Sequence, residues 1–412
     1  MKRSLAFALV FFLTGITVVH AGGPTFTRFG LGDIIFFGDP RASAIGITGI
    51  ALTGDGFINT MNPAGLAGIT RTRIFGGFEY LSSTISDQAG SERFVRGGFQ
   101  GIALAVPASP DDGLVLFAQA SPFSRVDYNA EVREPLPPSP FTQGLKGVGG
   151  LSSLSLGASY RPLTRLDIGL KFTYYYGTIQ QLASVDFDDS AFEDSEIQKS
   201  LFHSGMNFAL GLTYRGLADL PGSSFFQPLT VGLILSAPAK LSVKEERILL
   251  TSTSSDTASV ARGTTDLPLG LGVGASYLVA DRTLISGEVF HQQWGSANFF
   301  GIPPVGIRNS GRYGIGVEFL PPRNPETYWA AVAYRAGFTY HSSYYSINGQ
   351  PVNEWYGSAG VGLPIGPDAR LHLTAQIGSR RAASGALPKE TFVRISASFS
   401  ASEAWFLTIE ED

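Results

Sequence analysis

The chain has 412 residues, of which 16% are charged, 12% are aromatic and 50 are glycine, and its formal net charge is −4. Disordered chains combine few aromatic residues with high charge, so this composition excludes a disordered protein. Nucleic-acid-binding domains carry clustered basic residues, and the acidic balance without any basic run excludes that class as well.

The first 21 residues have the pattern of a secretory signal peptide. Lys2 and Arg3 precede an apolar run from Leu5 to Val19, and a small-x-small cleavage site ends at Ala21. The apolar run is shorter than the roughly 20 residues that a membrane-spanning helix needs. We therefore expect the chain to be exported, with a buried N-terminal helix as the alternative. Because the chain has no Cys, no disulfide framework is expected.

Residues 22–70 are the part of the exported chain that lacks a strand pattern. This segment is rich in Gly and mixed in polarity, yet it is neither charged nor repetitive enough for a disordered segment. Since it precedes the first predicted strand, we expect it to fold into the lumen of a barrel as a plug, or hatch. A periplasmic extension is the alternative.

The rest of the chain, residues 71–407, repeats a period-two pattern. For example, Leu154, Leu156 and Tyr160 alternate with Ser153 and Ser155. A period of two places the apolar set and the small or polar set on opposite faces of a strand. Fourteen strands are predicted, at residues 71–82, 96–107, 113–131, 149–161, 165–183, 200–216, 227–246, 266–279, 282–296, 308–320, 327–341, 353–364, 369–380 and 391–402.

Three features favour a membrane-spanning barrel over a soluble sandwich, whose strands would also alternate. The predicted strands are about 12 to 20 residues long, which exceeds the usual five or six of soluble strands. Apolar segments end in aromatic residues such as Tyr214 and Phe319, as at a membrane interface. No helical periodicity is present. We therefore expect an all-β fold, a 14-stranded antiparallel transmembrane β-barrel in a bacterial outer membrane, followed by an acidic C-terminal tail at residues 408–412.

The connectors between the predicted strands alternate between short and long. Long ones are expected at 132–148, 184–199 and 247–265, among others. Short periplasmic turns and long outer loops are typical of outer-membrane barrels.

Two short motifs stand out from the strand pattern. An Asn-Pro-Ala triplet lies in the plug segment, and a Ser-Pro-Phe triplet interrupts the third predicted strand. Pro has no N–H, so it breaks one hydrogen bond of a strand ladder and is confined to edges and bulges. The two motifs consist of Asn62, Pro63 and Ala64 and of Ser121, Pro122 and Phe123.

With these motifs, the chain resembles the FadL-like family of outer-membrane transporters for long-chain fatty acids and other hydrophobic compounds. The hairpin at residues 155–173 and the count of fourteen strands are also similar to the family pattern. The resemblance implies passive uptake of hydrophobic or amphipathic small molecules, which leave sideways at the kinked third strand. It also implies capture by apolar residues of the outer loops, such as Phe141 or the pair Tyr344 and Tyr345.

A second function stays open. The Trp405-Phe406 pair near the end of the chain resembles the ending of FadL-fold barrels associated with type IX secretion. That branch implies a role in protein secretion or surface anchoring. A plain ion porin is a third possibility, which a plug of this length argues against. The expected partners are a hydrophobic ligand, outer-membrane lipid or lipopolysaccharide and the barrel-assembly machinery, and no nucleic acid.

Several charged residues are expected to face the lumen, because they fall on the small or polar face of their strands. On the lipid face each Arg would cost about 2–4 kcal/mol near the membrane midplane. Such residues could hold the plug through ion pairs, or one of them could meet the carboxylate of a bound amphiphile. The candidates are Arg161, Arg215, Glu318, Arg335 and Arg394.

The sequence contains no pattern of an enzyme. The four His residues of the exported chain form no spaced metal motif, and no Ser lies in a nucleophile context. The acidic stretch at 186–196 is expected to be a solvated outer loop, with weak binding of a divalent ion as the alternative. We expect no catalytic residue, no resident metal and no cofactor, since downhill transfer needs none.

Overall fold

The computed structural model describes residues 25–36, 39–86, 90–134, 140–189, 191–215, 226–251, 255–302, 306–382 and 388–403. The signal peptide expected at 1–21, the acidic tail expected at 408–412 and the Trp405-Phe406 pair lie outside these residues. No helix within the described ranges is both long and apolar enough to cross a membrane.

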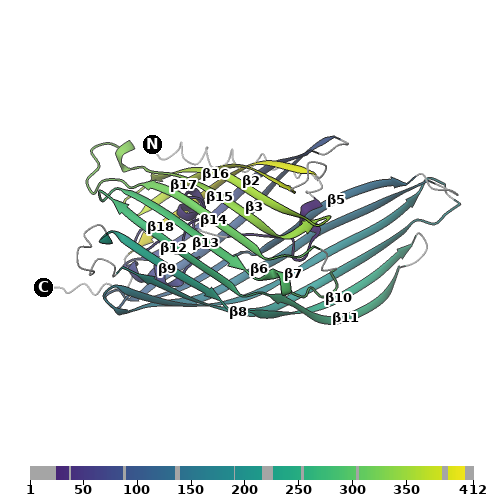
Figure 1. Ribbon diagram of the computed structural model, residues 1–412, viewed down its shortest axis with the longest axis horizontal. Coiled ribbons are helices and arrows are strands. Elements are labelled where there is room, and N and C mark those ends of the chain that lie inside the picture. Colours follow the sequence, from purple (N-terminus) through teal and green to yellow (C-terminus); the bar gives the residue numbers. More distant parts are fainter. Residues whose placement is uncertain are drawn as a thin grey trace, which may run out of the picture.

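The described chain forms one closed antiparallel sheet (Figure 1). Its last strand pairs with the first long strand, from Lys389 opposite Ser86 to Glu403 opposite Thr72, which closes the barrel. The strands are β2 (Thr72–Ser86), β3 (Ser91–Ser109), β4 (Leu114–Pro122), β5 (Ser124–Glu134), β6 (Phe141–Leu163), β7 (Leu166–Phe187), β8 (Ser195–Tyr214), β9 (Leu229–Ser236), β10 (Ala239–Thr251), β11 (Ser255–Leu267), β12 (Gly270–Val279), β13 (Thr283–Gln292), β14 (Ser310–Phe319), β15 (Ala333–Ile347), β16 (Gln350–Pro364), β17 (Ala369–Ala382) and β18 (Lys389–Glu403).

Three barrel strands are each interrupted once, so the seventeen strand pieces make fourteen barrel strands. β4 and β5 both pair with β6, and β9 and β10 both pair with β8. β11 and β12 continue one another opposite β10 and β9. The expected 14-stranded antiparallel barrel is thereby confirmed.

The alternation of the sequence gives the barrel two different faces. On β18, Ile395 is 50% exposed on the outer face, whereas the next residue, Ser396, is 4% exposed and faces inward. The same holds on β8, where Phe208 and Leu210 are exposed and Asn207 is buried. An apolar outer face is what a barrel in hydrocarbon requires.

Several stretches that we expected to be loops are strand. β6 begins at Phe141, β8 begins at Ser195, and β10 pairs with β11 from Ala239 opposite Leu267 to Leu250 opposite Ser255. The strands β5, β6, β7, β8, β10 and β11, which we call the long strands, extend beyond the rest of the barrel at one end (Figure 1). Strand pairing continues there although the apolar alternation stops, because a ladder in water needs no lipid-facing residues. The alternation therefore underestimates strand length at this end.

The described part of residues 22–70 packs against the inner face of the barrel. It contains η1 (Thr25–Arg28), β1 (Asp33–Ile34), α2 (Pro40–Ala44) and η2 (Pro63–Gly68). The segment contacts the wall closely, since a Cβ atom at Gly169 of β7 would overlap the backbone of Pro63. The role of this segment as a hatch stays a prediction.

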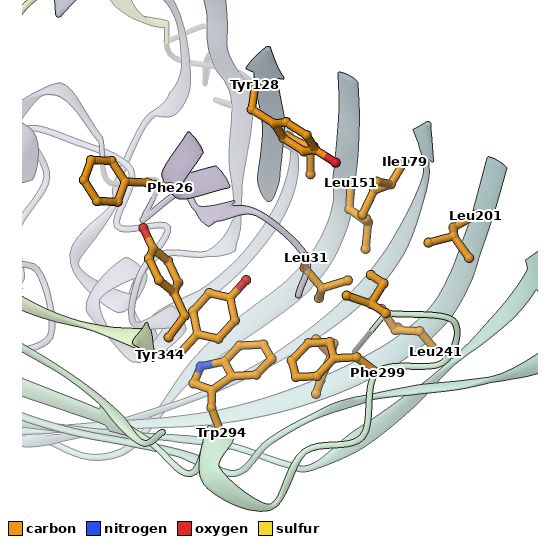
Figure 2. Close-up of a cluster of buried hydrophobic side chains, with 14 of the residues drawn as sticks. Phe26, Leu31, Tyr128, Leu151, Ile179, Leu201, Leu241, Trp294, Phe299 and Tyr344 are labelled. Carbon is orange, nitrogen blue, oxygen red and sulfur yellow. The ribbon is translucent and has the colours of Figure 1, made fainter. Parts of the chain in front are cut away.

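Apolar side chains fill the interior at the end of the barrel where the long strands extend (Figure 2). The connection between β13 and β14 contributes Trp294 and Phe299, which pack on Tyr344 at ring-centroid distances of 4.8 and 6.2 Å. We call this set the outer apolar cluster. Its buried members are Phe26, Leu31, Val126, Tyr128, Leu151, Ile179, Leu201, Leu241, Val243, Leu267, Trp294, Phe299, Ile302, Tyr344, Tyr345, Val352 and Ala382.

Candidate functional site

The third barrel strand breaks at Phe123. β4 ends at Pro122 and β5 begins at Ser124. The backbone of Phe123 is still hydrogen-bonded, because its N–H donates to the carbonyl oxygen of Leu151 on β6 at 2.8 Å. Its own carbonyl oxygen accepts the N–H of Ile35 at 2.8 Å, a residue of the N-terminal segment rather than of a barrel strand.

The break opens the ladder on the side of β3. β3 pairs with β4 from Ser109 to Ile102, and within the described residues the remaining part, Ser91–Gly101, has no pairing with β5. On its other side β3 stays paired with β2 as far as Ser91. We call the opening between Ser91–Gly101 and β5 the side gap.

The N-terminal segment covers the edge of β5 that faces the side gap. Asp33 and Ile34 of β1 pair with Arg125 and Ser124 of β5. Further along, Thr27 Oγ1 accepts the backbone N–H of Asp127 at 3.0 Å and donates to its carbonyl oxygen at 2.9 Å.

This close approach depends on a glycine of the segment. Gly32 has a φ of +83°, and a Cβ atom there would overlap the carbonyl group of Arg125. A left-handed backbone without a side chain is the conformation that glycine tolerates best. The residue type at position 32 therefore lets the segment lie directly on β5.

A cavity of about 170 Å³ lies inside the barrel next to the break. Pro122 and Phe123 form one side of it, and Phe123 packs on Tyr175 with ring centroids 4.5 Å apart. We call it the kink cavity. Its lining mixes apolar and polar residues: Ile34, Ile35, Phe36, Ile50, Thr60, Met61, Gln119, Ser121, Pro122, Phe123, Ser153, Ser155, Lys171, Thr173, Tyr175, Asn207, Ala209, Ile234, Ser236, Phe290, Gln292 and Arg312.

A second, more strongly charged cavity lies on the other side of β1. There Asp33 accepts two hydrogen bonds from Nη1 of Arg380, at 2.7 and 2.9 Å. Nη2 of Arg380 also pairs with Glu354 at 2.6 Å. Near the side gap, Glu79 pairs with Arg125 at 3.2 Å. The N-terminal segment is thus tied to β17 by charge and to β5 by backbone hydrogen bonds.

The Asn-Pro-Ala motif lies where the segment meets the wall. Asn62 Oδ1 accepts the N–H of Ala64 at 3.1 Å and so caps η2. Its Nδ2 donates to the carbonyl oxygens of Ile50 at 2.7 Å, of Leu212 on β8 at 3.1 Å and of Leu233 on β9 at 3.3 Å. A single amide therefore joins two parts of the segment and two barrel strands.

The five charged candidates all face the interior, in three separate places. Arg335 pairs with Glu318 at 2.8 Å, and Glu318 also pairs with Arg41 of the N-terminal segment at 2.5 Å. Sequence reasoning missed Arg41, because nothing in an irregular segment indicates where a side chain points.

Arg161 and Arg215 share a single carboxylate. They pair with Asp167 at 2.7 and 2.6 Å, and Arg161 also donates to the carbonyl oxygen of Ala67 at 2.8 Å. Asp167 was missed although the alternation of β7 places it on the inner face. Arg394 lies apart from both groups and donates to Gln376 at 2.8 Å.

The N-terminal segment also holds a buried carboxyl group outside the barrel strands. Asp39 caps α2 by accepting the N–H groups of Arg41 at 2.6 Å and Ala42 at 3.0 Å. Burial raises the pKa of Asp39 to about 6, against the lowering effect of these hydrogen bonds and of the Arg41 charge.

The expected ligand-capture residues do not lie together on outer loops. Tyr344 and Tyr345 are 2% and 1% exposed and belong to β15, which continues as far as Ile347. The single hydroxyl proton of Tyr344 is shared between the carbonyl oxygens of Phe29 and Gly32, which lie 2.8 and 2.7 Å from Oη. The prediction is wrong for this pair, because the apolar alternation ends before the strand does.

Among the described residues, no group of three or more His, Asp or Glu side chains could hold a metal ion. Within the acidic stretch at 186–196, Asp194 accepts the backbone N–H of Phe187 at 2.8 Å, and Asp188 pairs with Arg133. These two carboxylates have partners within the chain.

Comparisons with known proteins agree with this architecture. The family model of BamG matches residues 1–410. No curated protein matches the sequence. Among solved structures, a FadL homologue from Pseudomonas aeruginosa is similar, with 12% identity and a TM-score of 0.62, over 90% of this chain and 99% of that one.

Two further solved structures are similar over nearly their whole length. The toluene transporter TbuX of Ralstonia pickettii has 15% identity and a TM-score of 0.57, with 92% of this chain and 99% of that one covered. The toluene transporter TodX of Pseudomonas putida has 14% identity and a TM-score of 0.58, with 91% and 100% covered. The FadL-like fold is thereby confirmed, and the apolar outer face agrees with a barrel of the outer membrane.

Proposed function

The chain belongs to the BamG family and has a FadL-like barrel, and we propose that it is an outer-membrane channel for the passive uptake of hydrophobic or amphipathic small molecules. The observation that carries this proposal is the kink cavity, which borders the break in the barrel wall at Pro122 and Phe123. A cavity beside a wall opening offers a solute a route from the lumen into the bilayer.

The lining of the kink cavity favours an amphipathic solute. Ile35, Phe36 and Phe290 offer apolar surface, while Asn207 and Lys171 offer polar groups. Ligand sites combine apolar walls with a few polar groups that fix orientation. TbuX and TodX are named as toluene transporters, so small aromatic hydrocarbons and fatty acids are the first substrates to test.

Sideways exit through the side gap is the second part of the proposal. Hydrocarbon cannot satisfy exposed backbone groups, so a gap at membrane depth has to be lined by protein or open to water. The N-terminal segment supports this function because it satisfies β5 from inside, through Ile34 and Thr27, without closing the ladder to β3. In this proposal residues 22–70 act as the hatch.

Access from outside is the third part. The outer apolar cluster fills the interior at the end where the long strands extend. An apolar solute can replace side-chain contacts within such a cluster at little cost, whereas ions and water cannot. We therefore expect the cluster, rather than exposed outer loops, to admit the solute.

Solute uptake by a variant with a straightened third barrel strand tests the proposal. Pro122→Val combined with Phe123→Thr should restore the ladder between β3 and β5 and slow uptake of labelled toluene or fatty acid at least fivefold. Pro107→Val is the matched control, because Pro107 lies in the paired half of β3 opposite Val115. Uptake by the double variant equal to that of the wild type, at matched membrane abundance, would rule out exit at this position.

A second function is favoured by the family itself. Membership of the BamG family supports an association with the barrel-assembly machinery, in line with a role in handling other outer-membrane proteins. Co-purification of that machinery with the chain from native membranes, together with wild-type hydrocarbon uptake in a deletion strain, would favour this function over the channel.

A further inference from the structure

We propose that the open edge of β3, from Ser91 to Gly101, is a docking site for a β-strand of another protein. This partner would enter the side gap and add to β3 through backbone hydrogen bonds. The proposal goes beyond small-molecule uptake. It concerns the backbone edge of the side gap rather than the cavities, and a bound strand would close the sideways exit that runs through the same gap.

The edge is long and begins at membrane depth. β3 pairs with β2 through residue 91, but its pairing with β4 stops at Ile102. At that level, Phe78 of β2 and Phe99 of β3 pack on each other on the outer face, with ring centroids 5.7 Å apart and both rings exposed. Unpaired backbone groups beside a lipid-facing aromatic pair need a partner that offers N–H and C=O groups at strand spacing.

The two edges of the gap differ next to the break. There β5 is covered by the chain itself, through Asp33 opposite Arg125 and Ile34 opposite Ser124. β1 therefore shows strand addition at one side of the gap, while β3 lacks the equivalent partner among the described residues. A single added strand would complete the wall.

The sequence of β3 protects this edge only in part. Natural edge strands are protected by Lys, Pro, short length, bulges or inward-facing charges. Residues 91–101 have the inward Arg96 and a bulge at Gln100, but they contain neither Lys nor Pro and include Gly97, Gly98 and Gly101. Glycines let another backbone approach closely, so the composition favours docking.

The side chains at the gap indicate the chemistry of the partner. Arg96 lies on the inner face of β3, and its buried Nε has no hydrogen-bond partner. Nη2 of Arg125 lies 3.0 Å from the position of a Cβ atom at Gly98, so a second guanidinium group faces the same strand. Glu79 forms ion pairs with both Arg125 and Arg394, at 3.2 and 3.8 Å.

Arg96, Arg125 and Arg394 thus lie beside the open edge, where Glu79 and Asp33 are the nearby acids. An inward-facing Asp or Glu on the added strand would supply an acceptor for the Nε of Arg96. The partner is therefore an amphipathic strand with apolar residues toward lipid and at least one acidic residue toward the lumen. A lipid headgroup could offer an acceptor to Arg96, but it could not form a ladder with β3.

Disulfide trapping tests the docking site, since the chain has no Cys of its own. Val95→Cys places a thiol on the lipid-facing side of the open half, and Leu104→Cys places one on the same side of the paired half. The probe is a synthetic 12-residue peptide of alternating Val and Thr with one Asp and one central Cys. In lipid nanodiscs we expect cross-linking at least tenfold faster at Val95→Cys than at Leu104→Cys.

Two altered peptides identify the mode of binding. N-methylation of alternate residues removes backbone donors and should abolish the preference for Val95→Cys, and replacement of Asp by Lys should reduce it. Equal rates at both positions, or undiminished trapping of the N-methylated peptide, would overturn the proposal. Native heat-modifiable mobility shows that both variants are folded.

Photo-cross-linking in living cells separates the possible occupants. With a photoreactive residue at position 95, the expected product is a protein adduct whose linked peptide is an alternating strand with an inward acidic residue. A product of two copies of this chain, or lipid adducts alone, would overturn the proposal. This readout is independent of solute uptake, so the channel function and the docking site can fail separately.

Discussion

The backbone N–H of Ile35 donates to the carbonyl oxygen of Phe123 at 2.8 Å, which joins the N-terminal segment to the residue where the third barrel strand breaks. The hatch segment and the kink are therefore one structural unit. A displacement of residues 27–35 would break the hydrogen bonds to the backbone of β5 at Ser124, Arg125 and Asp127. In the same way, a change of backbone conformation at the kink would break the hydrogen bond to Ile35.

Substitution of Arg380 should lower the stability of the barrel more than substitution of Asp33, its partner in an ion pair. Arg380→Gln leaves Asp33 and Glu354 without their cation and should destabilise the barrel by about 3–5 kcal/mol. Asp33→Asn leaves Arg380 with Glu354 and Glu390 and should cost less. Urea unfolding in lipid vesicles measures both variants, and equal losses would contradict this account of the cluster.

The contact between the Asn-Pro-Ala motif and the barrel wall can be tested by a substitution in β8. A Cβ atom at Gly211 of β8 would overlap Oδ1 of Asn62, so Gly211→Val should displace η2 from the wall. The variant should fold and conduct ions in planar bilayers, whereas the wild type conducts poorly. Gly357→Val is the control, because nothing lies within 4 Å of a Cβ atom there. Equal conductance of the two variants would mean that the segment does not block the lumen.

The two faces of β18 should respond differently to the same charge. Ile395→Arg places a guanidinium group in lipid and should cost about 2–4 kcal/mol, enough to impair assembly. Ser396→Arg places the same group in the charged cavity, within reach of acidic side chains such as Glu79, and should assemble normally. Heat-modifiable mobility of membrane fractions gives the comparison, and equal impairment would show that the lumen does not tolerate charge.

The buried carboxyl group of Asp39 should make stability depend on pH. Its pKa in the folded protein is about 6 and its ordinary value is 3.8, so the folded state holds the proton more tightly. Its contribution to stability is therefore fully present at low pH and is lost as the pH rises toward and through about 6.

Asp39→Asn keeps a capping side chain and does not titrate. The variant should match the wild type near pH 4 and be more stable than it near pH 7.5, by at most about 3 kcal/mol. Denaturant unfolding at the two pH values measures this difference. A variant that loses stability at pH 7.5 would show that the charged cap outweighs the cost of burial.

Local pattern was sufficient for the barrel wall but not for what lies inside it. The inner position of Arg335 follows from alternation alone, because a strand has only two faces. Its partner Arg41 does not, since α2 lies in a segment without periodicity and is 277 residues away from Glu318 in the chain. The predicted loop position of Tyr344 was wrong for a related reason. β15 continues beyond the part of the strand whose outward side chains are apolar and face lipid.

The side gap likewise has one part that the local sequence predicts and another part that only tertiary contacts determine. Pro122 indicates a break in the ladder from its chemistry, since it lacks an N–H. The extent of the unpaired edge on β3 follows only from the register of β3 against β4, and the cover on β5 follows only from tertiary contacts of Thr27 and Asp33. The sequence therefore predicts where the ladder breaks, whereas the strand pairing determines which backbone groups stay free for a partner.

The contacts of the N-terminal segment also set an order of assembly. Thr27 is bonded to Asp127, 100 residues away, and Asp33 to Arg380, 347 residues away. Contacts between such distant residues require the closure of very long loops, and they cannot form before both partners are in place. The contacts of the segment with β5 can therefore form early, whereas the ion pair of Asp33 forms only when β17 has joined the wall. The interior of the barrel is complete only at that late stage.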